Sequence, residues 1–214
     1  MTRKDYLNAE EFRRGLETLD AEMGINPYLS AFGPIKLITA GGFLAVSYLG
    51  SRKTTGDLDY LLDPRWAHDN DIKNPLREAM GRVGERLQFN NDWINEDIAL
   101  FVTKESREYL FREAQKQKII LWEGPNLVVL AAPMEWALER KLRRIHAGNR
   151  DRKAEFDLQD ALAILKYLRD KNGPLDKEYI RRLNVNSFDM SPDNATMDRV
   201  ALAYRNEFKE EVFR

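Results

Sequence analysis

Residues 35–62 read IKLITAGGFLAVSYLGSRKTTGDLDYLL, and this stretch decides the fold. Its first part, IKLITA, is an apolar run followed by Gly41 and Gly42, which is typical of a buried strand that ends in a tight turn. The next residues, FLAVSYL, predict a short apolar helix, and the polar residues 51–56 predict a loop. A second strand then begins at Asp57. The expected order is therefore strand, glycine turn, helix, loop, strand.

Asp57 and Asp59 occupy alternate positions of the second predicted strand. Successive side chains of a strand point to opposite faces, so we expect both carboxylates on one face and Leu58 and Tyr60 on the other. Two like charges at this spacing repel each other, which is costly unless a cation lies between them. A hard cation that prefers oxygen ligands fits such a position. The pair therefore predicts a Mg²⁺ or Mn²⁺ site.

Gly41 and Gly42 lie where the first strand gives way to the helix. Glycine lets the backbone turn sharply and lets a ligand approach the main chain, and the first N–H groups of a helix are available to a phosphate. A phosphate cradle beside a metal site predicts a nucleoside triphosphate as ligand. In the loop, Arg52 is a candidate contact to the triphosphate, and Thr55 could bind phosphate or orient the aspartates. A polar turn that caps the strand would also explain these loop residues.

Each of these signals alone has a simpler explanation. An acid-rich chain produces Asp-x-Asp pairs by chance, and a Gly-Gly pair is usually only a turn. The ordered combination of turn, helix and paired aspartates is far more specific than either part.

Composition places the chain among ordinary globular proteins. Its 214 residues are 43% hydrophobic and 32% charged, and 34 Lys and Arg nearly balance 35 Asp and Glu. This balance gives no global attraction to nucleic acid or to a membrane. The chain has no cysteine, which excludes disulfides and thiol catalysis, and its first residues carry no apolar signal segment. We therefore expect a cytoplasmic protein with no membrane partner.

Other segments supply the rest of an α+β fold. Residues 8–23 and 66–87 predict amphipathic helices, and further strands are expected at residues 98–102, 119–122 and 127–132. After Pro133 the pattern is helical to the last residue. We therefore expect an α/β core over residues 1–132, in which helices flank a mixed sheet, and a helical C-terminal region over residues 133–214 that packs on the core.

The stretch GGFLAVSYLGSRKTTGDLDYLL resembles the signature of the DNA polymerase β-type nucleotidyltransferases. Within that superfamily it is most similar to the AbiEii-like enzymes of bacterial type IV toxin-antitoxin systems. The resemblance continues more weakly in AAPMEWALERKLRRI and RKAEFDLQDALAIL, and it spans most of residues 35–168. It implies a nucleotidyltransferase-like sheet, catalysis with Mg²⁺ or Mn²⁺, and transfer of a nucleoside monophosphate from a nucleoside triphosphate to a hydroxyl. It also implies tRNA, another RNA or a protein as acceptor, and an antitoxin-like protein as partner.

Catalysis in this superfamily generally needs a third carboxylate on a neighbouring strand. Asp92 and Asp97 are the candidates, with Asn95 as a polar substitute, and we favour Asp92. The loop that carries Arg52 is about one residue longer than expected of the family, which weakens the role of that arginine. If no third acid reaches Asp57 and Asp59, catalysis becomes doubtful.

Lys141 is the candidate contributed by the C-terminal region. In residues 134–145 the apolar positions recur three or four residues from Lys141, so its side chain falls on the inward stripe of the helix and needs a carboxylate or phosphate partner. The resemblance implies that it lies near the nucleotide, whereas a lysine at the edge of the core is the plain alternative. Asp157 and Asp160 are possible partners for Lys141 or Arg152.

Three functions compete at this point. The first is the metal-dependent nucleotidyltransferase, and the basic residues 139–153 could receive the backbone of an RNA acceptor. The second is a degenerate relative that binds a nucleotide or a protein partner and transfers nothing. The third is an interaction protein in which the acidic strand is only a surface feature.

Overall fold

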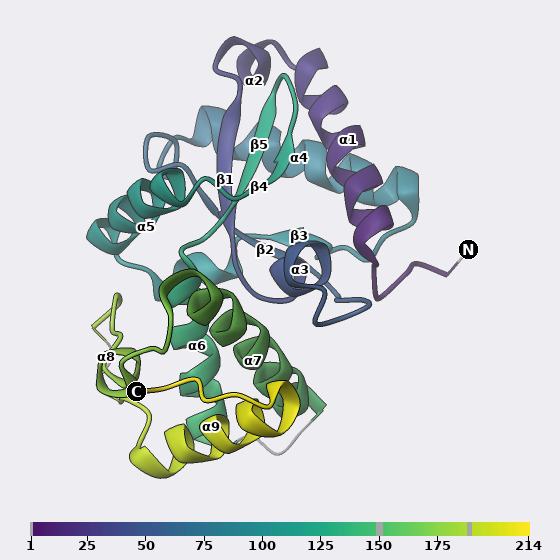
Figure 1. Cartoon of the computed structure of the whole chain (residues 1–214). Coiled ribbons are helices and arrows are strands. Elements are labelled where there is room, and N and C mark those ends of the chain that lie inside the picture. Colours follow the sequence, from purple (N-terminus) through teal and green to yellow (C-terminus); the bar gives the residue numbers. More distant parts are fainter. Residues whose placement is uncertain (1, 149–151, 188–189) are drawn as a thin grey trace. The chain divides into compact units, whose positions relative to one another are not determined.

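Five strands form one mixed sheet in the computed structural model, which describes residues 2–148, 152–187 and 190–214 (Figure 1). The strand order is β3-β2-β1-β5-β4. Pairs β1–β5 and β2–β3 are parallel, and pairs β1–β2 and β4–β5 are antiparallel. The strands are β1 (Ile35–Thr39), β2 (Leu58–Leu62), β3 (Ile94–Asn95), β4 (Ile120–Glu123) and β5 (Leu127–Ala131).

The chain divides into two compact units, Met1–Ala132 and Pro133–Arg214. The first contains the sheet and its helices, which confirms the expected α+β class with helices flanking a mixed sheet. Its helical segments are α1 (Ala9–Ile25), α2 (Pro27–Ala31), α3 (Gly42–Leu44), the π-helical η1 (Ala45–Leu49), α4 (Asn70–Leu87), the 3₁₀-helical η2 (Asp97–Phe101) and α5 (Lys104–Gln117).

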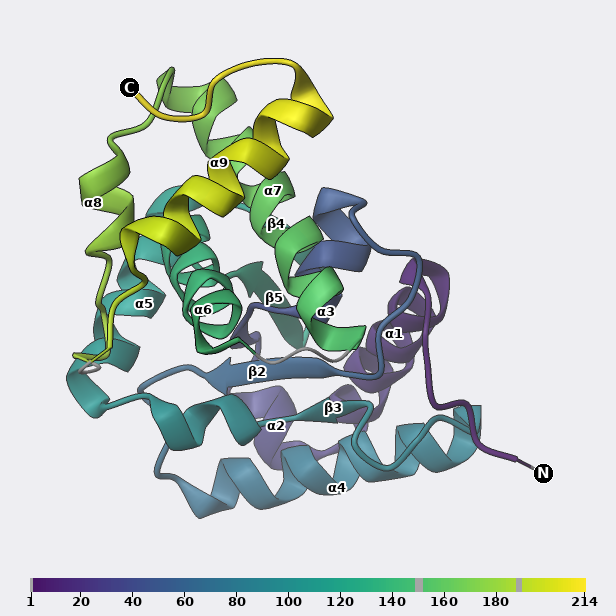
Figure 2. The ribbon, with the colours of Figure 1, turned by 90° about the horizontal axis from the view of Figure 1, so that it is seen from below.

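The core of the first unit lies between the sheet and the helices α1 and α4, which contact each other (Figure 2). Leu37, Leu58 and Tyr60 face this core together with Phe12 of α1 and Val83 of α4. Because side chains alternate along a strand, Asp59 points to the face of the sheet away from this core.

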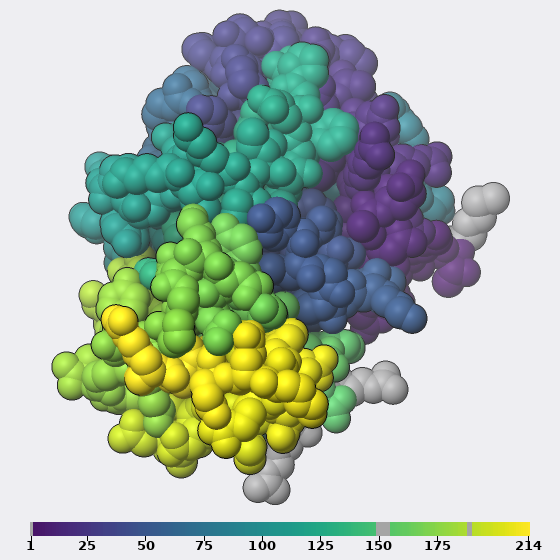
Figure 3. All heavy atoms as spheres, in the orientation of Figure 1, coloured from purple at the N-terminus to yellow at the C-terminus, as the bar shows by residue number. Residues whose placement is uncertain are grey.

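Helix α1 begins with a complete capping box, in which Asn8 accepts from the Glu11 backbone and Glu11 accepts from the Asn8 backbone. Further along, the buried carboxylate of Asp20 accepts hydrogen bonds from the backbone of Asn126 and Leu127 at 2.9 and 2.8 Å. These bonds join α1 to the turn between β4 and β5, which lies against it at the surface (Figure 3).

The second unit is helical and consists of α6 (Met134–Ala147), α7 (Arg152–Asn172), α8 (Lys177–Arg181) and α9 (Asn194–Phe208). Helices α6 and α7 form its main contact, and α9 packs on both of them. Leu142 of α6, Leu165 of α7 and Tyr204 of α9 are buried. No helix among the described residues of either unit is long and apolar enough to cross a membrane.

The expected strand at residues 98–102 is wrong. Its residues form η2, and β3 is only the pair Ile94–Asn95. The side chain of Asn95 accepts from the Asp97 backbone at 3.0 Å, and Ala99 donates to the Glu96 carbonyl at 2.8 Å. These local bonds turn the chain away from the sheet. The helix expected at residues 66–87 begins only at Asn70, where Asp69 caps it, and it continues through Pro75.

Candidate functional site

The turn after β1 brings backbone close to a carboxylate. Gly41 has φ +94°, a conformation that side chains other than glycine rarely adopt. A Cβ placed on Gly41 would lie 3.4 Å from Oδ2 of Asp59. The glycine turn and the aspartate strand, 18 residues apart in sequence, therefore meet at one edge of the sheet, where β1 ends and the antiparallel β2 begins.

Gly42 lies under the side chain of Thr55. A Cβ on Gly42 would come within 2.0 Å of the Thr55 hydroxyl oxygen, so only glycine fits without a shift of the loop. Thr55 is 6% exposed. Its side chain therefore packs on the backbone of the turn.

The N-terminal segment holds the loop that precedes Asp57. Leu7 and Thr55 exchange two backbone hydrogen bonds of 2.8 and 3.0 Å. The side-chain amide of Asn90 donates to the carbonyl of Gly56 at 2.8 Å and to that of Asp5 at 3.3 Å. Three segments distant in sequence thus fix the entry of the chain into β2.

Asp57 directly precedes β2 and Asp59 lies within it, and both side chains are half-buried. The carbonyl of Asp59 accepts a hydrogen bond of 2.7 Å from the Thr39 hydroxyl, which ties the strand to β1. Alternation within β2 puts Asp59 on the face of the strand opposite Leu58 and Tyr60. A carboxylate beside a glycine backbone, with a second carboxylate two residues away in sequence, offers oxygen atoms, the ligands that Mg²⁺ and Mn²⁺ prefer. The type of donor fits the expected metal.

Asn95 is the register partner of Asp59 in the parallel pair β2–β3. Its side chain bonds to local backbone, because the amide donates to the Asp92 carbonyl at 3.1 Å and the oxygen accepts from Asp97. Asp92 lies in the exposed loop before β3, and Asp97 is exposed at the start of η2. Within residues 2–148, 152–187 and 190–214, no three acidic or histidine side chains gather as a metal-binding group.

Glu96 is a buried carboxylate that sequence reasoning missed. Its oxygens lie 3.2 Å from Lys73, 3.3 Å from Arg77 and 3.2 Å from Arg107. Burial raises the pKa of the neighbouring Tyr60 phenol, and the charge of Glu96 raises it further. The only available signal was alternation, which puts Glu96 on the opposite face from Asn95 and so toward the positive residues of α4. This cluster cross-links α4, α5 and the end of β3 on the core side of the sheet.

Lys141 is buried in the second unit, where its ammonium lies 2.9 Å from Asp157 and 2.5 Å from Asp160. The expected inward direction and a carboxylate partner are confirmed. Arg144 also donates two bonds of 2.7 Å to Asp157. Burial lowers the pKa of Lys141, although Asp160 and Asp157 oppose this effect. Burial acts to raise the pKa of Asp157, but the bonds from Arg144 and the charge of Lys141 outweigh it and the pKa is lowered.

Two further predictions concern positively charged residues, namely Arg52 and the basic run at residues 139–153. Arg52 is half-exposed in the loop between η1 and β2. Of the basic run at residues 139–153, residues 149–151 and the side chains of Arg152 and Lys153 lie outside the described part of the chain. The expected pairing of Arg152 with Asp157 or Asp160 therefore lies outside it too.

A scan against models of protein families, a search of curated proteins and a search of solved structures each found no match.

Proposed function

We propose that the first unit is a metal-dependent nucleotidyltransferase that moves a nucleoside monophosphate from a nucleoside triphosphate to a hydroxyl of an RNA or a protein. The observation that carries the proposal is the approach of the Gly41 backbone to the Asp59 carboxylate, with 3.4 Å between Oδ2 and the position of a Cβ. A phosphate lying on the glycine turn would be within reach of a cation held by the aspartates.

Each residue has a defined role in this proposal. Asp57 and Asp59 hold Mg²⁺ or Mn²⁺, which when bound stabilises charge on the attacking and leaving oxygens. Gly41 and Gly42 admit the phosphates to the backbone, and Thr55 fixes the turn. Arg52 contacts the triphosphate.

The reaction is an in-line displacement at the α-phosphorus. The acceptor oxygen forms a bond to phosphorus, the bond to the bridging oxygen breaks, and pyrophosphate leaves. Asp92 is the proposed base that takes the hydroxyl proton. Lys141 keeps its proposed role near the nucleotide, although Asp157 and Asp160 hold its ammonium within its own unit. Catalysis rests on orientation and electrostatics, without a covalent enzyme intermediate.

A second candidate function is nucleotide binding without transfer. It is favoured by one observation, that the position opposite Asp59 on β3 is Asn95, whose side chain bonds to neighbouring backbone. An amide cannot act as a general base at neutral pH. If Asp92 does not reach the acceptor, the site binds the nucleotide and the reaction does not proceed.

The test measures two quantities on the full chain. Binding of each ribonucleoside triphosphate with Mg²⁺ or Mn²⁺ is followed by calorimetry, and transfer of label is followed into total RNA and into protein. Asp57→Asn and Asp59→Asn remove the metal ligands, and Asp71→Asn, at an exposed position in the first turn of α4, is the matched control.

We expect binding and transfer that are lost in Asp57→Asn and Asp59→Asn and kept in Asp71→Asn. Binding without transfer from any donor supports the second candidate. Absence of nucleotide binding by the folded protein overturns both. Loss of transfer with retained binding in Asp92→Asn would identify the base.

The protein partner and the cellular location are also proposals. An antitoxin-like partner and a cytoplasmic location both follow from the resemblance and the composition. Co-purification of the chain with a partner encoded beside it would test the first, and failure to form a complex would remove it.

A further inference from the structure

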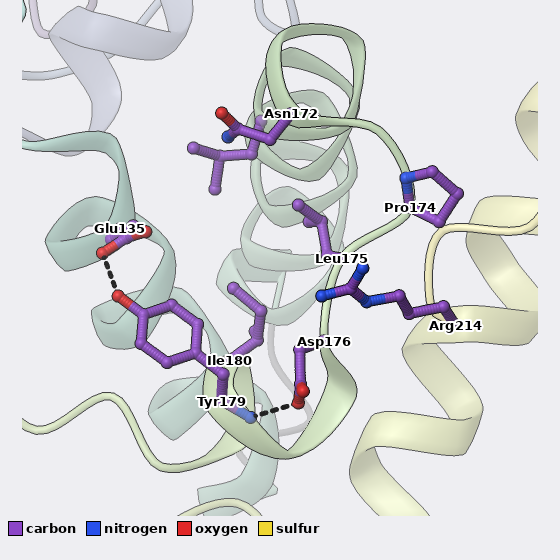
Figure 4. A pocket seen from close by; sticks show the side chains of 9 residues that line it. Glu135, Asn172, Pro174, Leu175, Asp176, Tyr179, Ile180 and Arg214 are labelled. Atoms are coloured by element: carbon purple, nitrogen blue, oxygen red, sulfur yellow. Dashed lines mark hydrogen bonds between the residues drawn. The ribbon is translucent and has the colours of Figure 1, made fainter.

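The second unit has a cavity of about 450 Å³ at one end of α7 (Figure 4). Its wall comes from four places: the start of α6, the end of α7 with the following loop, α8, and the last residues of the described chain. The lining residues are Glu135, Leu168, Asn172, Pro174, Leu175, Asp176, Tyr179, Ile180 and Arg214. Its volume lies within the range of about 300–1,000 Å³ typical of small-molecule sites.

The floor of this cavity is apolar. Leu168, Leu175 and Ile180 are 6%, 8% and 2% exposed. Leu175 donates to the Val212 carbonyl at 2.9 Å and accepts from the Arg214 backbone at 3.0 Å. This short parallel pairing places the Arg214 side chain at the cavity. The positive charge of the cavity therefore comes from a tertiary contact between segments distant in sequence.

Opposite charges stand on the two sides of the floor. Glu135 and Arg214 lie on opposite sides in Figure 4, with Leu175 and Ile180 between them. The Tyr179 hydroxyl donates to Oε2 of Glu135 at 2.8 Å, which orients that carboxylate. Within the described residues, the Arg214 guanidinium takes part in no hydrogen bond or ion pair.

Asp176 adds a second negative charge to the rim. Its Oδ1 accepts from the Tyr179 backbone at 2.8 Å and caps α8, so one oxygen is committed to the fold. A purely anionic ligand would face Glu135 and Asp176, and a purely cationic one would face Arg214. A ligand that carries both charges around an apolar group matches the whole cavity.

We propose that this cavity binds the zwitterion of an aliphatic α-amino acid. The α-ammonium group lies at Glu135, the α-carboxylate at Arg214, and the side chain on Leu168 and Ile180. Arginine suits this position because its planar group can bind a carboxylate through two parallel bonds. All lining residues belong to the second unit, so the site is independent of Asp57 and Asp59.

Calorimetric titration of the full chain with L-leucine at millimolar concentration tests the proposal. Three analogues each remove one feature: leucinamide lacks the carboxylate, 4-methylpentanoate lacks the ammonium, and glycine lacks the apolar side chain. The variants are Arg214→Gln and Glu135→Gln, and the latter keeps an acceptor for Tyr179. Arg182→Gln is the matched control, because Arg182 is 72% exposed in the same unit and pairs with Glu178 outside the cavity.

We expect saturable binding of leucine, at least about tenfold weaker in Arg214→Gln and in Glu135→Gln and unchanged in Arg182→Gln. Each analogue is expected to bind about tenfold more weakly or worse. Asp57→Asn should bind leucine as the natural chain does, which separates this result from the nucleotide test. Absence of binding, equal binding by all variants, or equal binding of 4-methylpentanoate would overturn the proposal.

Discussion

The molecule holds two pairs of aspartates that differ in their spacing and in their burial. Asp157 and Asp160 are spaced for a helix, are 6% and 1% exposed, and face the cations Lys141 and Arg144. Asp57 and Asp59 are spaced for a strand and are half-buried, and Asp59 lies beside the backbone of Gly41. We call Asp157 and Asp160 the helix pair, which is held by two cations, and Asp57 and Asp59 the strand pair, of which Asp59 lies against a glycine backbone.

The largest expected effect comes from breaking the helix pair. Lys141→Met leaves two buried carboxylates without their shared ammonium, and we expect the free energy of unfolding to fall by about 3–5 kcal/mol. Urea denaturation measures the change. The control is Lys116→Met, at an exposed lysine that pairs with Glu113 on α5, which should change little. Equal effects of the two variants would show that the buried cluster does not stabilise the fold.

The next prediction tests the packing of the glycine turn that lies beside Asp59. Gly42→Ala would place a Cβ 2.0 Å from the Thr55 hydroxyl oxygen, and we expect a loss of about 1–3 kcal/mol from overpacking. Thr55→Gly in the same chain should recover part of this loss. Gly81→Ala is the control, because a Cβ there meets nothing within 4 Å and alanine favours the helix by up to about 1 kcal/mol. Tolerance of Gly42→Ala would mean that the turn and loop are not tightly packed.

A smaller effect concerns pH. The folded pKa of Asp157 lies below its unfolded value near 3.8, so its charged form stabilises the fold above that value and the stabilisation is lost as the pH falls through the folded pKa. Urea midpoints should therefore stay nearly constant from about pH 6 to pH 5 and decrease as the pH falls through about 3.8 and below. Arg144→Gln removes the strongest hydrogen bonds to this carboxylate, so its profile should be flatter. An identical profile in both proteins would assign the acid sensitivity to other groups.

The smallest expected change in stability is at the strand pair itself. Asp57→Asn and Asp59→Asn each replace a half-buried carboxylate by an amide of nearly the same size, so we expect the free energy of unfolding to change by less than about 1 kcal/mol. The same variants should abolish the quenching of protein fluorescence by Mn²⁺. A loss of stability as large as that of Lys141→Met would assign these aspartates to the fold and remove the contrast between the two pairs.

Local patterns in the sequence determined the features that depend on near neighbours. Alternation predicted that Asp59 faces away from Leu58 and Tyr60, and helical spacing predicted that Lys141 points inward to a carboxylate. The apolar runs around the turn at residues 123–126 predicted β4 and β5 to within about one residue. Each of these depends on the period of one element, which is fixed by its backbone geometry.

Tertiary structure alone decided the rest. The register that sets Asn95 opposite Asp59, the contact between Gly42 and Thr55, and the cations around Glu96 all join residues distant in sequence. The apolar residues 98–102 looked like a strand, but the side chain of Asn95 diverted the chain into a 3₁₀-helix. Periodicity says which face a side chain occupies, whereas the element that covers that face is set by the packing of the whole unit.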